Sequence, residues 1–446
     1  MRLRNNEIFN EVFSLTIPIT IQMLISIGMS TIDSFTVGHL GDLVIGGVGA
    51  ANKFLTVANS LSQSFIGVAG IYIGQFYGAK NNNKMSNVFK SSLQFGIFIS
   101  CLLVIFSAAF PKQIISFYNT EQEIINSGSL YIRISSFSYI LMAISTCISM
   151  YLRNTKYHKS IVRVSLISIV CKLLLNYSFI FLFETGVVGV GICNILTRLV
   201  ELSLYISVLK INKIEPLAYS DKCSDKILVK EIMKKAIPLM INDFLYSASF
   251  SITLKFLGMR DTCGYNGYII SSSFVEILRC FLSGYGGSCA IYISQKLGNN
   301  DIEGANKSIS SLVIYGMLFS IFITILGFTF VLGIPVFYKN SAIETIAAAR
   351  QITIIQSLLI PLWMYNFITY NILRSGGDMK SVMIMDSGMN WLVQIPVMYM
   401  LLSVTDFGTN MIFTVGQLGE VAKMAVSTIL VKKGRWMVNM AGDKND

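Results

Sequence analysis

Apolar stretches of about 20 residues recur along nearly the whole chain, and they constrain the fold more than any other feature. Each stretch is long enough to cross a hydrocarbon layer of about 30 Å as an α-helix. Of the 446 residues, 53% are hydrophobic and only 13% are charged, whereas about 25% are charged in an average soluble domain. The sequence therefore excludes a soluble fold and predicts an all-α polytopic membrane protein.

The long apolar runs predict twelve transmembrane helices. We expect them at residues 13–38, 44–77, 91–110, 126–152, 161–183, 186–209, 231–257, 264–297, 308–335, 345–373, 381–403 and 407–431. The first run is too long to be the apolar core of a cleaved signal peptide, so we expect it to be retained as a helix.

Lysine and arginine concentrate in alternate loops between the predicted helices, as in 80–90, 153–159 and 210–235. Basic loops remain on the cytoplasmic side of a membrane, so the pattern predicts a multi-pass protein of the plasma (inner) membrane with both termini in the cytoplasm. The net charge of +11 is explained by this topology. We therefore expect membrane lipids, and no nucleic acid, among the partners, and we expect the chain to be a monomer.

An internal repeat divides the chain into two halves. When residue 71 is aligned with residue 291, IYIGQFYGAK at 71–80 falls on IYISQKLGNN at 291–300, and eight of thirty positions from there onward are identical. The longest polar segment lies midway between the copies. We predict an N-terminal six-helix lobe at 1–211, a cytoplasmic linker at 212–230 and a C-terminal six-helix lobe with a short tail at 231–446, related by an axis along the membrane normal.

The sequence offers little material for a metal site or a catalytic centre. Only two histidines are present, His39 and His158, and the eight cysteines are scattered singly without a CxxC motif. We expect no metal and no cofactor. A membrane-bound enzyme, the interpretation from another functional class, would need a histidine cluster or an HExxH motif, and the sequence contains neither.

Seven segments together resemble the multidrug and toxic compound extrusion (MATE) family, in its DNA-damage-inducible-type branch. They are TIDSFTVGHLG, GQFYGAK, ETGVVGVGICNILTR, IPLMINDFLYS, LRSGGDMKS, DSGMNWLVQIP and GRWMVN, in that order along essentially the full chain. The resemblance implies a secondary-active transporter of two lobes with alternating access. Such a protein exports organic compounds, often cations, in exchange for a proton or a sodium ion.

Five polar residues in the first half are candidates for ion coupling and substrate binding: Asp33, Tyr131, Lys172, Asn176 and Asn194. Charges inside the hydrocarbon region are costly and usually face a cavity or a partner. Asp33 matches the coupling aspartate of the family, although an aspartate at this depth can also cap a turn at the membrane interface. Tyr131 and Asn194 match other polar positions of the network in the N-terminal lobe, and either can be an ordinary interhelical hydrogen-bonding residue.

Two residues of the fifth helix depart from the family pattern. Lys172 stands where the family usually has asparagine, and Asn176 stands where this branch often has aspartate. The ammonium group of Lys172 can pair with Asp33 in place of the coupling cation, which is the interpretation we prefer. Alternatively, Lys172 can titrate if burial lowers its pKa, or its side chain can extend outward to the membrane interface. Because the lobe has few carboxylates, we expect coupling to protons and not to sodium.

In the second half, Asp243 is the first candidate, because relatives carry an acidic residue there. Glu276 and Arg279, three residues apart on one helix, can pair with each other, and Asp386 can line a cavity. For these last three, we favour a satisfied structural pair over a role in transport chemistry.

Pro18 and Pro238 occupy equivalent places in the first and seventh helices. A missing N–H and a ring clash bend a helix at such positions, which makes both prolines candidate hinges or static kinks. One alternative function remains within the same superfamily. It is a flippase for lipid-linked oligosaccharides or polysaccharides, favoured by the cationic residues Lys172, Arg198, Lys255 and Arg279.

Overall fold

The computed structural model describes residues 2–38, 42–118, 121–218, 226–338 and 342–441, and these residues are almost entirely helical. The elements of the first half are α1 (Arg2–Gly38), α2 (Asp42–Gly78), α3 (Asn82–Ala109), α4 (Pro111–Ser116), α5 (Gln122–Ser135), α6 (Ser138–Asn154), α7 (His158–Tyr177), the π-helical η1 (Ser178–Leu182) and α8 (Gly186–Ile211).

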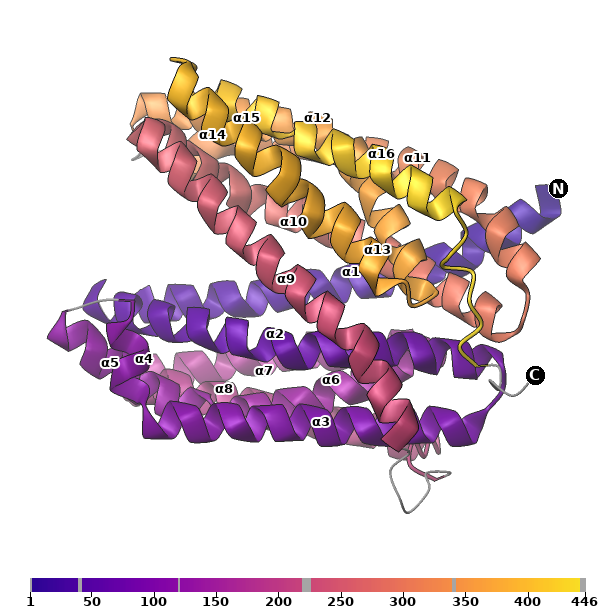
Figure 1. Ribbon diagram of the computed structural model, residues 1–446. Helices are drawn as coiled ribbons and strands as arrows, with labels where there is room; N and C mark the ends of the chain where they lie inside the picture. Colours follow the sequence, from indigo (N-terminus) through magenta and orange to yellow (C-terminus); the bar gives the residue numbers. More distant parts are fainter. Residues whose placement is uncertain (1, 39–41, 119–120, 219–225, 339–341, 442–446) are drawn as a thin grey trace. The chain divides into compact units, whose positions relative to one another are not determined.

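The elements of the second half are α9 (Lys226–Arg260), α10 (Thr262–Gly298), α11 (Ile302–Phe337), α12 (Ile343–Ser375), α13 (Met379–Met383), the π-helical η2 (Ile384–Gly388) and η3 (Asn390–Gln394), α14 (Ile395–Val404), α15 (Thr409–Gly416) and α16 (Leu418–Lys432). Figure 1 shows the helices of both halves in sequence colours.

The twelve predicted spans are confirmed in the described residues when consecutive segments are joined into single spans. Four of the spans are composite: α5 with α6, α7 with η1, α13 through α14, and α15 with α16. Within the same ranges, seven helices are long and apolar enough to span a membrane on their own, and α5 with α6 adds an eighth that bends by 45°. The fold is that of a polytopic helical membrane protein.

The helices extend further than the apolar runs that predicted them. The first span was expected from residue 13, whereas α1 begins at Arg2, and α3 begins at Asn82 where 91 was expected. Hydropathy detects only the part of a helix that lies in lipid, and polar turns continue the helix beyond it. Of the predicted linker, 219–225 lies outside the described residues, and Lys226–Lys230 already belongs to α9.

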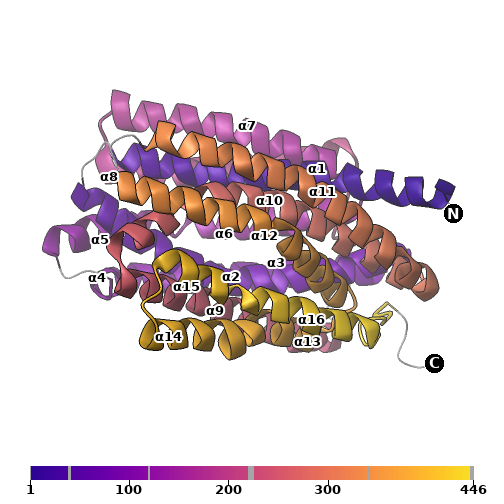
Figure 2. The ribbon, with the colours of Figure 1, turned by 90° about the horizontal axis from the view of Figure 1, so that it is seen from above.

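Two compact units divide the chain by their internal contacts, namely 21–240 and the combination of 1–20 with 241–446. The first turns of α1 thus pack with the second half of the chain, and the first turns of α9 pack with the first half. Phe9 illustrates this, because its ring lies 5.3 Å from that of Tyr315 on α11, where Figure 2 shows the two helices together. The lobe boundaries expected from the sequence, 1–211 and 231–446, stay a prediction.

Helix α11 shows how these helices suit a membrane. Its buried side consists largely of small residues such as Gly316, Ser320 and Gly327. Its exposed side carries large apolar residues, among them Leu318 and Ile325. In lipid, association depends on close backbone packing and not on burying apolar surface, so small residues face neighbouring helices and large ones face the acyl chains.

Close approach of α2 and α5 fixes the region around the predicted site. A Cβ on Gly128 would lie 2.7 Å from the backbone oxygen of Gly47, so both positions require glycine. Next to this contact, Leu55, Ile132 and Val190 belong to one buried apolar cluster that joins α2, α5 and α8. These contacts hold the helices that carry the polar residues in register.

The fifth and eleventh spans, which occupy equivalent places in the two halves, both contain π-helical turns. In the first half, η1 follows soon after Asn176, and in the second half η2 and η3 cover 384–388 and 390–394. A π-turn frees backbone groups and rotates the side chains that follow it, and such turns are frequent at functional sites. Both lie beside the polar clusters described next.

Candidate functional site

An ion pair between α1 and α7 forms the centre of the first cluster. The Nζ of Lys172 lies 2.7 Å from Oδ2 of Asp33, and the two side chains are 7% and 14% exposed. The predicted pairing is therefore confirmed. Because the ammonium group is turned to Asp33 and almost fully enclosed, the alternative of a lysine extending to the membrane interface is not supported.

The other three candidates of the first half meet at the same pair. Asn176 donates to Oδ1 of Asp33 at 3.4 Å, and Lys172 donates to Oδ1 of Asn194 at 3.1 Å. Asn194 in turn donates to the hydroxyl of Tyr131 at 3.1 Å. Helices α1, α5, α7 and α8 thus each contribute to one polar cluster, which we call the Asp33 cluster.

Two further residues belong to the Asp33 cluster and were not predicted. The Tyr131 hydroxyl donates to Oδ1 of Asn52 on α2 at 3.0 Å, and Asn176 donates to Oγ1 of Thr36 at 3.3 Å. A polar residue in an apolar span was the available signal for Asn52. Among the described residues, the buried Oδ1 of Asn176 has no hydrogen-bond partner, so an acceptor oxygen beside Asp33 is free.

A second buried charge cluster lies in the other unit. The Nζ of Lys423 on α16 is 3.1 Å from Oδ1 of Asp386 and 2.9 Å from Oε1 of Glu420. The lysine side chain is 4% exposed, and the two carboxylates are 17% and 14% exposed. We call this group the Asp386 cluster. Neither Lys423 nor Glu420 was predicted, although two charges three residues apart in the last apolar span could have indicated them.

Amide side chains complete the Asp386 cluster. Asn242 on α9 donates to Oδ2 of Asp386 at 3.0 Å and accepts a bond from the backbone N–H of Ser387 at 3.2 Å. Asn366 on α12 donates to Oε2 of Glu420 at 2.9 Å. Asp386, a secondary candidate in the sequence, is therefore part of a hydrogen-bonded network of largely enclosed side chains, in which the buried Oδ1 of Asn366 has no partner among the described residues.

The remaining candidates of the second half are Asp243, Glu276 and Arg279. Asp243 is half-buried next to Asn242, and its role stays a prediction. The expected pairing of Glu276 with Arg279 is wrong. The guanidinium group of Arg279 lies 4.9 Å from the ring centre of Trp363, whereas the Glu276 side chain is exposed. Arg279 also donates to the hydroxyl of Tyr246 on α9 at 3.4 Å, so its partners are aromatic side chains of other helices.

The repeat relation shows that the two halves differ at the position of the Asp33 pair. The alignment of the copies places Asp33 on Thr253, and Gln394 stands two positions beyond the place that the same alignment gives Lys172. These two also meet, since Nε2 of Gln394 donates to Oγ1 of Thr253 at 3.3 Å. The polar contact between these equivalent helices is thus charged in one unit and neutral in the other, although Gln394 does not occupy the position aligned with Lys172.

Duplicated sets of helices with buried charges inside the membrane spans are typical of polytopic membrane transporters. The family model MatE matches residues 18–178 and again 238–400. The starts of the two matches, 18 and 238, have the same offset as the repeat found in the sequence. The chain belongs to the MATE family of membrane transporters. Its assignment to the DNA-damage-inducible-type branch stays a prediction.

Relatives of similar length support the assignment. The chain is 22% identical over 409 residues to the "Probable multidrug resistance protein YoeA" of Bacillus subtilis, covering 87% of this chain and 85% of that protein. It is 23% identical over 421 residues to the "Probable multidrug resistance protein NorM" of Thermotoga maritima, covering 90% and 87%.

Solved structures share the fold. A structure described as "MATE in the bent conformation" has a TM-score of 0.86 at 13% identity, covering 98% of this chain and 97% of that one. A eukaryotic MATE transporter, AtDTX14, has a TM-score of 0.83 at 15% identity, also covering 98% and 97%.

Proposed function

We propose that this protein is a secondary-active exporter of organic compounds that exchanges its substrate for protons by alternating access in the plasma membrane, with both termini in the cytoplasm. The names of the relatives, which include multidrug resistance proteins, support the substrate class. The single observation that carries the coupling mechanism is the enclosed Asp33–Lys172 pair. Charged side chains inside a membrane span are costly to bury, and they therefore usually mark a functional site.

Proton exchange at Asp33 would change the charge of its cluster by one unit. In the deprotonated state the carboxylate neutralises Lys172 and accepts bonds from Lys172 and Asn176. A proton on Asp33 removes the attraction and leaves the ammonium group with the Asn194 oxygen alone. The pair would then separate, and the helices that carry it, α1 and α7, would lose a contact that favours one arrangement of the lobe.

Sodium is the weaker candidate for the coupling ion. Asp33 is the single carboxylate of its cluster among the described residues, and an ammonium group already occupies the cation position at 2.7 Å. A sodium ion prefers several oxygen ligands and would be repelled by Lys172 at this distance. A proton needs only one oxygen, and the free Oδ1 of Asn176 can accept a bond from protonated Asp33 or from a bound water.

Pro18 and Pro238 are proposed hinges. Each lies two residues before the point where its helix passes from one compact unit to the other, at 20–21 in α1 and at 240–241 in α9. Because each proline removes one backbone hydrogen bond at that point, bending is cheapest there. Asp243 lies on α9 a few residues beyond the second of these points, so a bend there would move its carboxylate.

The flippase alternative receives less support. A headgroup with several phosphates would need unpaired cations, but Lys172 is paired with Asp33 and Arg198 forms an ion pair with Glu201. Lys255 is exposed. Among the described residues, Lys255 and Arg279 form no ion pair, and of these two only Arg279 is partly buried inside its span, where it stacks on Trp363.

Efflux driven by a pH gradient tests the proposal. In proteoliposomes, the Asp33→Asn variant should lose export of a fluorescent organic cation, because an amide of the same size cannot exchange a proton. Asp406→Asn is the matched control, since that carboxylate is exposed and should be dispensable. Undiminished efflux by an inserted Asp33→Asn variant would remove Asp33 from the mechanism.

The identity of the ion needs a separate measurement. Wild-type proteoliposomes should export the dye under a pH gradient without sodium, and a sodium gradient at equal pH on both sides should drive no export. Export under the sodium gradient alone would overturn proton coupling while leaving the exporter function intact.

A further inference from the structure

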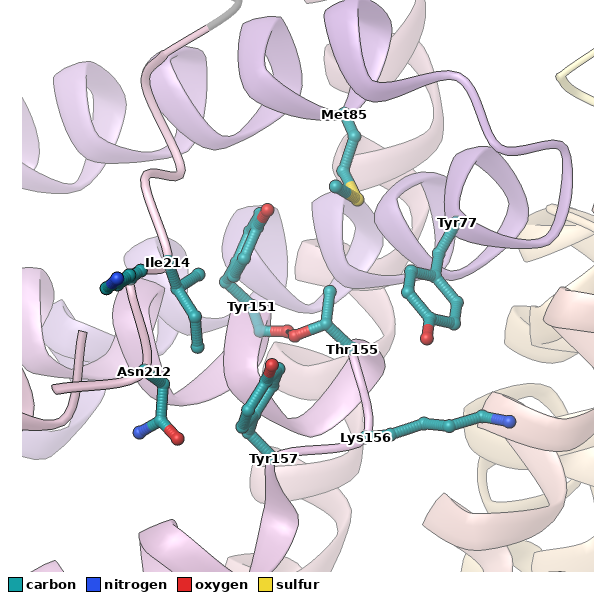
Figure 3. Close-up of a pocket in the computed structure, with 9 residues that line it drawn as sticks. Tyr77, Met85, Tyr151, Thr155, Lys156, Tyr157, Asn212 and Ile214 are labelled. Atoms are coloured by element: carbon teal, nitrogen blue, oxygen red, sulfur yellow. Dashed lines mark hydrogen bonds between the residues drawn. The ribbon is translucent and has the colours of Figure 1, made fainter. Parts of the chain in front are cut away.

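A pocket of about 430 Å³ lies at one end of the unit formed by 21–240, where α2, α6 and α8 end. It shares no residue with the Asp33 cluster. Figure 3 shows Tyr77, Tyr151 and Tyr157 around it, with Asn212 and Ile214 on the side opposite Tyr77. The loops at this end are those predicted to face the cytoplasm.

Three tyrosine hydroxyl groups in this pocket have no partner among the described residues. Tyr151 is 6% exposed and Tyr157 is 37% exposed. All three tyrosines line the open pocket, where their hydroxyl groups can donate to a ligand or to water.

Two ammonium groups accompany these hydroxyls. Lys156 and Lys213 line the pocket, and no acidic residue is among the nine lining residues. Neither lysine forms an ion pair with a described residue. In Figure 3 the Lys156 side chain extends on the Tyr77 side. The pocket therefore offers hydrogen-bond donors and positive charge, with apolar contact from Met85 and Ile214.

We propose that this pocket binds the phosphate group of an anionic phospholipid from the cytoplasmic leaflet. Phosphate oxygens accept bonds from hydroxyl and ammonium groups at the same time, which is the combination present here. Basic pockets between transmembrane helices on the cytoplasmic side suit anionic headgroups, and tyrosine favours the membrane interface. The apolar side chains would contact the glycerol or the first acyl carbons.

A titration of the purified full-length protein in uncharged detergent tests the proposal. Native mass spectrometry would count bound dioctanoyl phosphatidylglycerol, with dioctanoyl phosphatidylcholine and glycerol 3-phosphate as the comparison ligands. We expect saturable binding of phosphatidylglycerol and at least tenfold weaker binding of the other two. Equally tight binding of phosphatidylcholine would overturn the proposal, because that headgroup carries no net negative charge.

Glycine substitutions remove the ammonium groups without disturbing the backbone. Lys156 and Lys213 follow helix ends in the left-handed region, with φ of 70° and 51°, a conformation that glycine adopts without strain. Lys156→Gly with Lys213→Gly should weaken phosphatidylglycerol binding at least tenfold. Lys80→Gly is the matched control, since Lys80 has φ of 56° at the end of α2 but does not line the pocket.

Further measurements test the role of Tyr151 and distinguish a lipid from a soluble phosphate as the ligand. Tyr151→Phe keeps the ring and should weaken binding several-fold. Unchanged binding in the Lys156→Gly, Lys213→Gly variant would refute the site. If glycerol 3-phosphate binds as tightly as the lipid and depends on the same lysines, the anion site stands and its lipid source is rejected.

Discussion

The ion pair between Asp33 and Lys172 predicts that the effect on stability of changing one residue depends on whether the other is present. We expect Lys172→Met and Asp33→Asn each to destabilise the protein, and we expect the double variant to be less destabilised than the sum of the two. The reason is that each single change leaves the other group enclosed without its main partner, while the double change removes both charges.

The expected size follows from the burial of the pair. With side chains 7% and 14% exposed, removal of one partner should cost about 3 to 5 kcal/mol. The remaining hydrogen bonds soften the loss, since Asp33 keeps the 3.4 Å bond from Asn176 and Lys172 keeps the 3.1 Å bond to Asn194. The coupling energy of the cycle should lie between about 0.5 and 3 kcal/mol.

Unfolding by SDS titration in mixed micelles measures these free energies, and thermal unfolding in detergent gives a second readout. Lys159→Met combined with Asp33→Asn is the control cycle. Lys159 is exposed and lies near the start of α7, about 20 Å along the helix from Lys172, so these effects should add. If the Asp33 and Lys172 effects also add, the two side chains do not stabilise each other and the coupling argument fails.

Two other changes should destabilise by different causes. Lys423→Met leaves two enclosed carboxylates without a counter-charge and should cost about 3 to 5 kcal/mol in the same SDS titration, whereas Lys432→Met, exposed at the end of the same helix, should have no effect. Gly128→Ala places a Cβ 2.7 Å from the backbone oxygen of Gly47 and should lower the free energy of unfolding by about 1 to 3 kcal/mol. Gly49→Ala is the control and should be neutral, because its Cβ would have no atom within 4 Å. If Gly49→Ala is the more destabilising of the two, the packing argument is refuted.

The number and order of the spans could be predicted from the sequence because hydropathy is a property of each segment alone. The duplication was equally accessible, since one nearly constant offset relates the copies along the chain. Helix ends were less accessible. The polar first turns of α1 and α9 have the composition of loops, and they are helical because the apolar helix that follows continues the backbone hydrogen bonds.

Ion pairs between helices could be predicted only where the resemblance to the family indicated which helices are adjacent. Asp33 and Lys172 are far apart in the sequence, and the family pattern placed them on adjacent helices. The bond between Lys423 and Asp386 depends on how α16 packs against the π-helical part of the eleventh span, which no spacing rule describes. Arg279 failed for a related reason, because aromatic partners from α9 and α12 lie closer than Glu276 on its own helix.

Replacing the charged pair with its neutral counterpart separates stability from ion coupling. In the other half, Thr253 and Gln394 form a neutral hydrogen bond between the equivalent helices. Asp33→Thr with Lys172→Gln should therefore be less destabilised than the sum of the two single variants, because no charge is left unpaired, and it should lose export driven by a pH gradient. If the double variant still exports under a pH gradient, the coupling proton does not bind at Asp33, and the carboxylates of the Asp386 cluster become the candidates for carrying it.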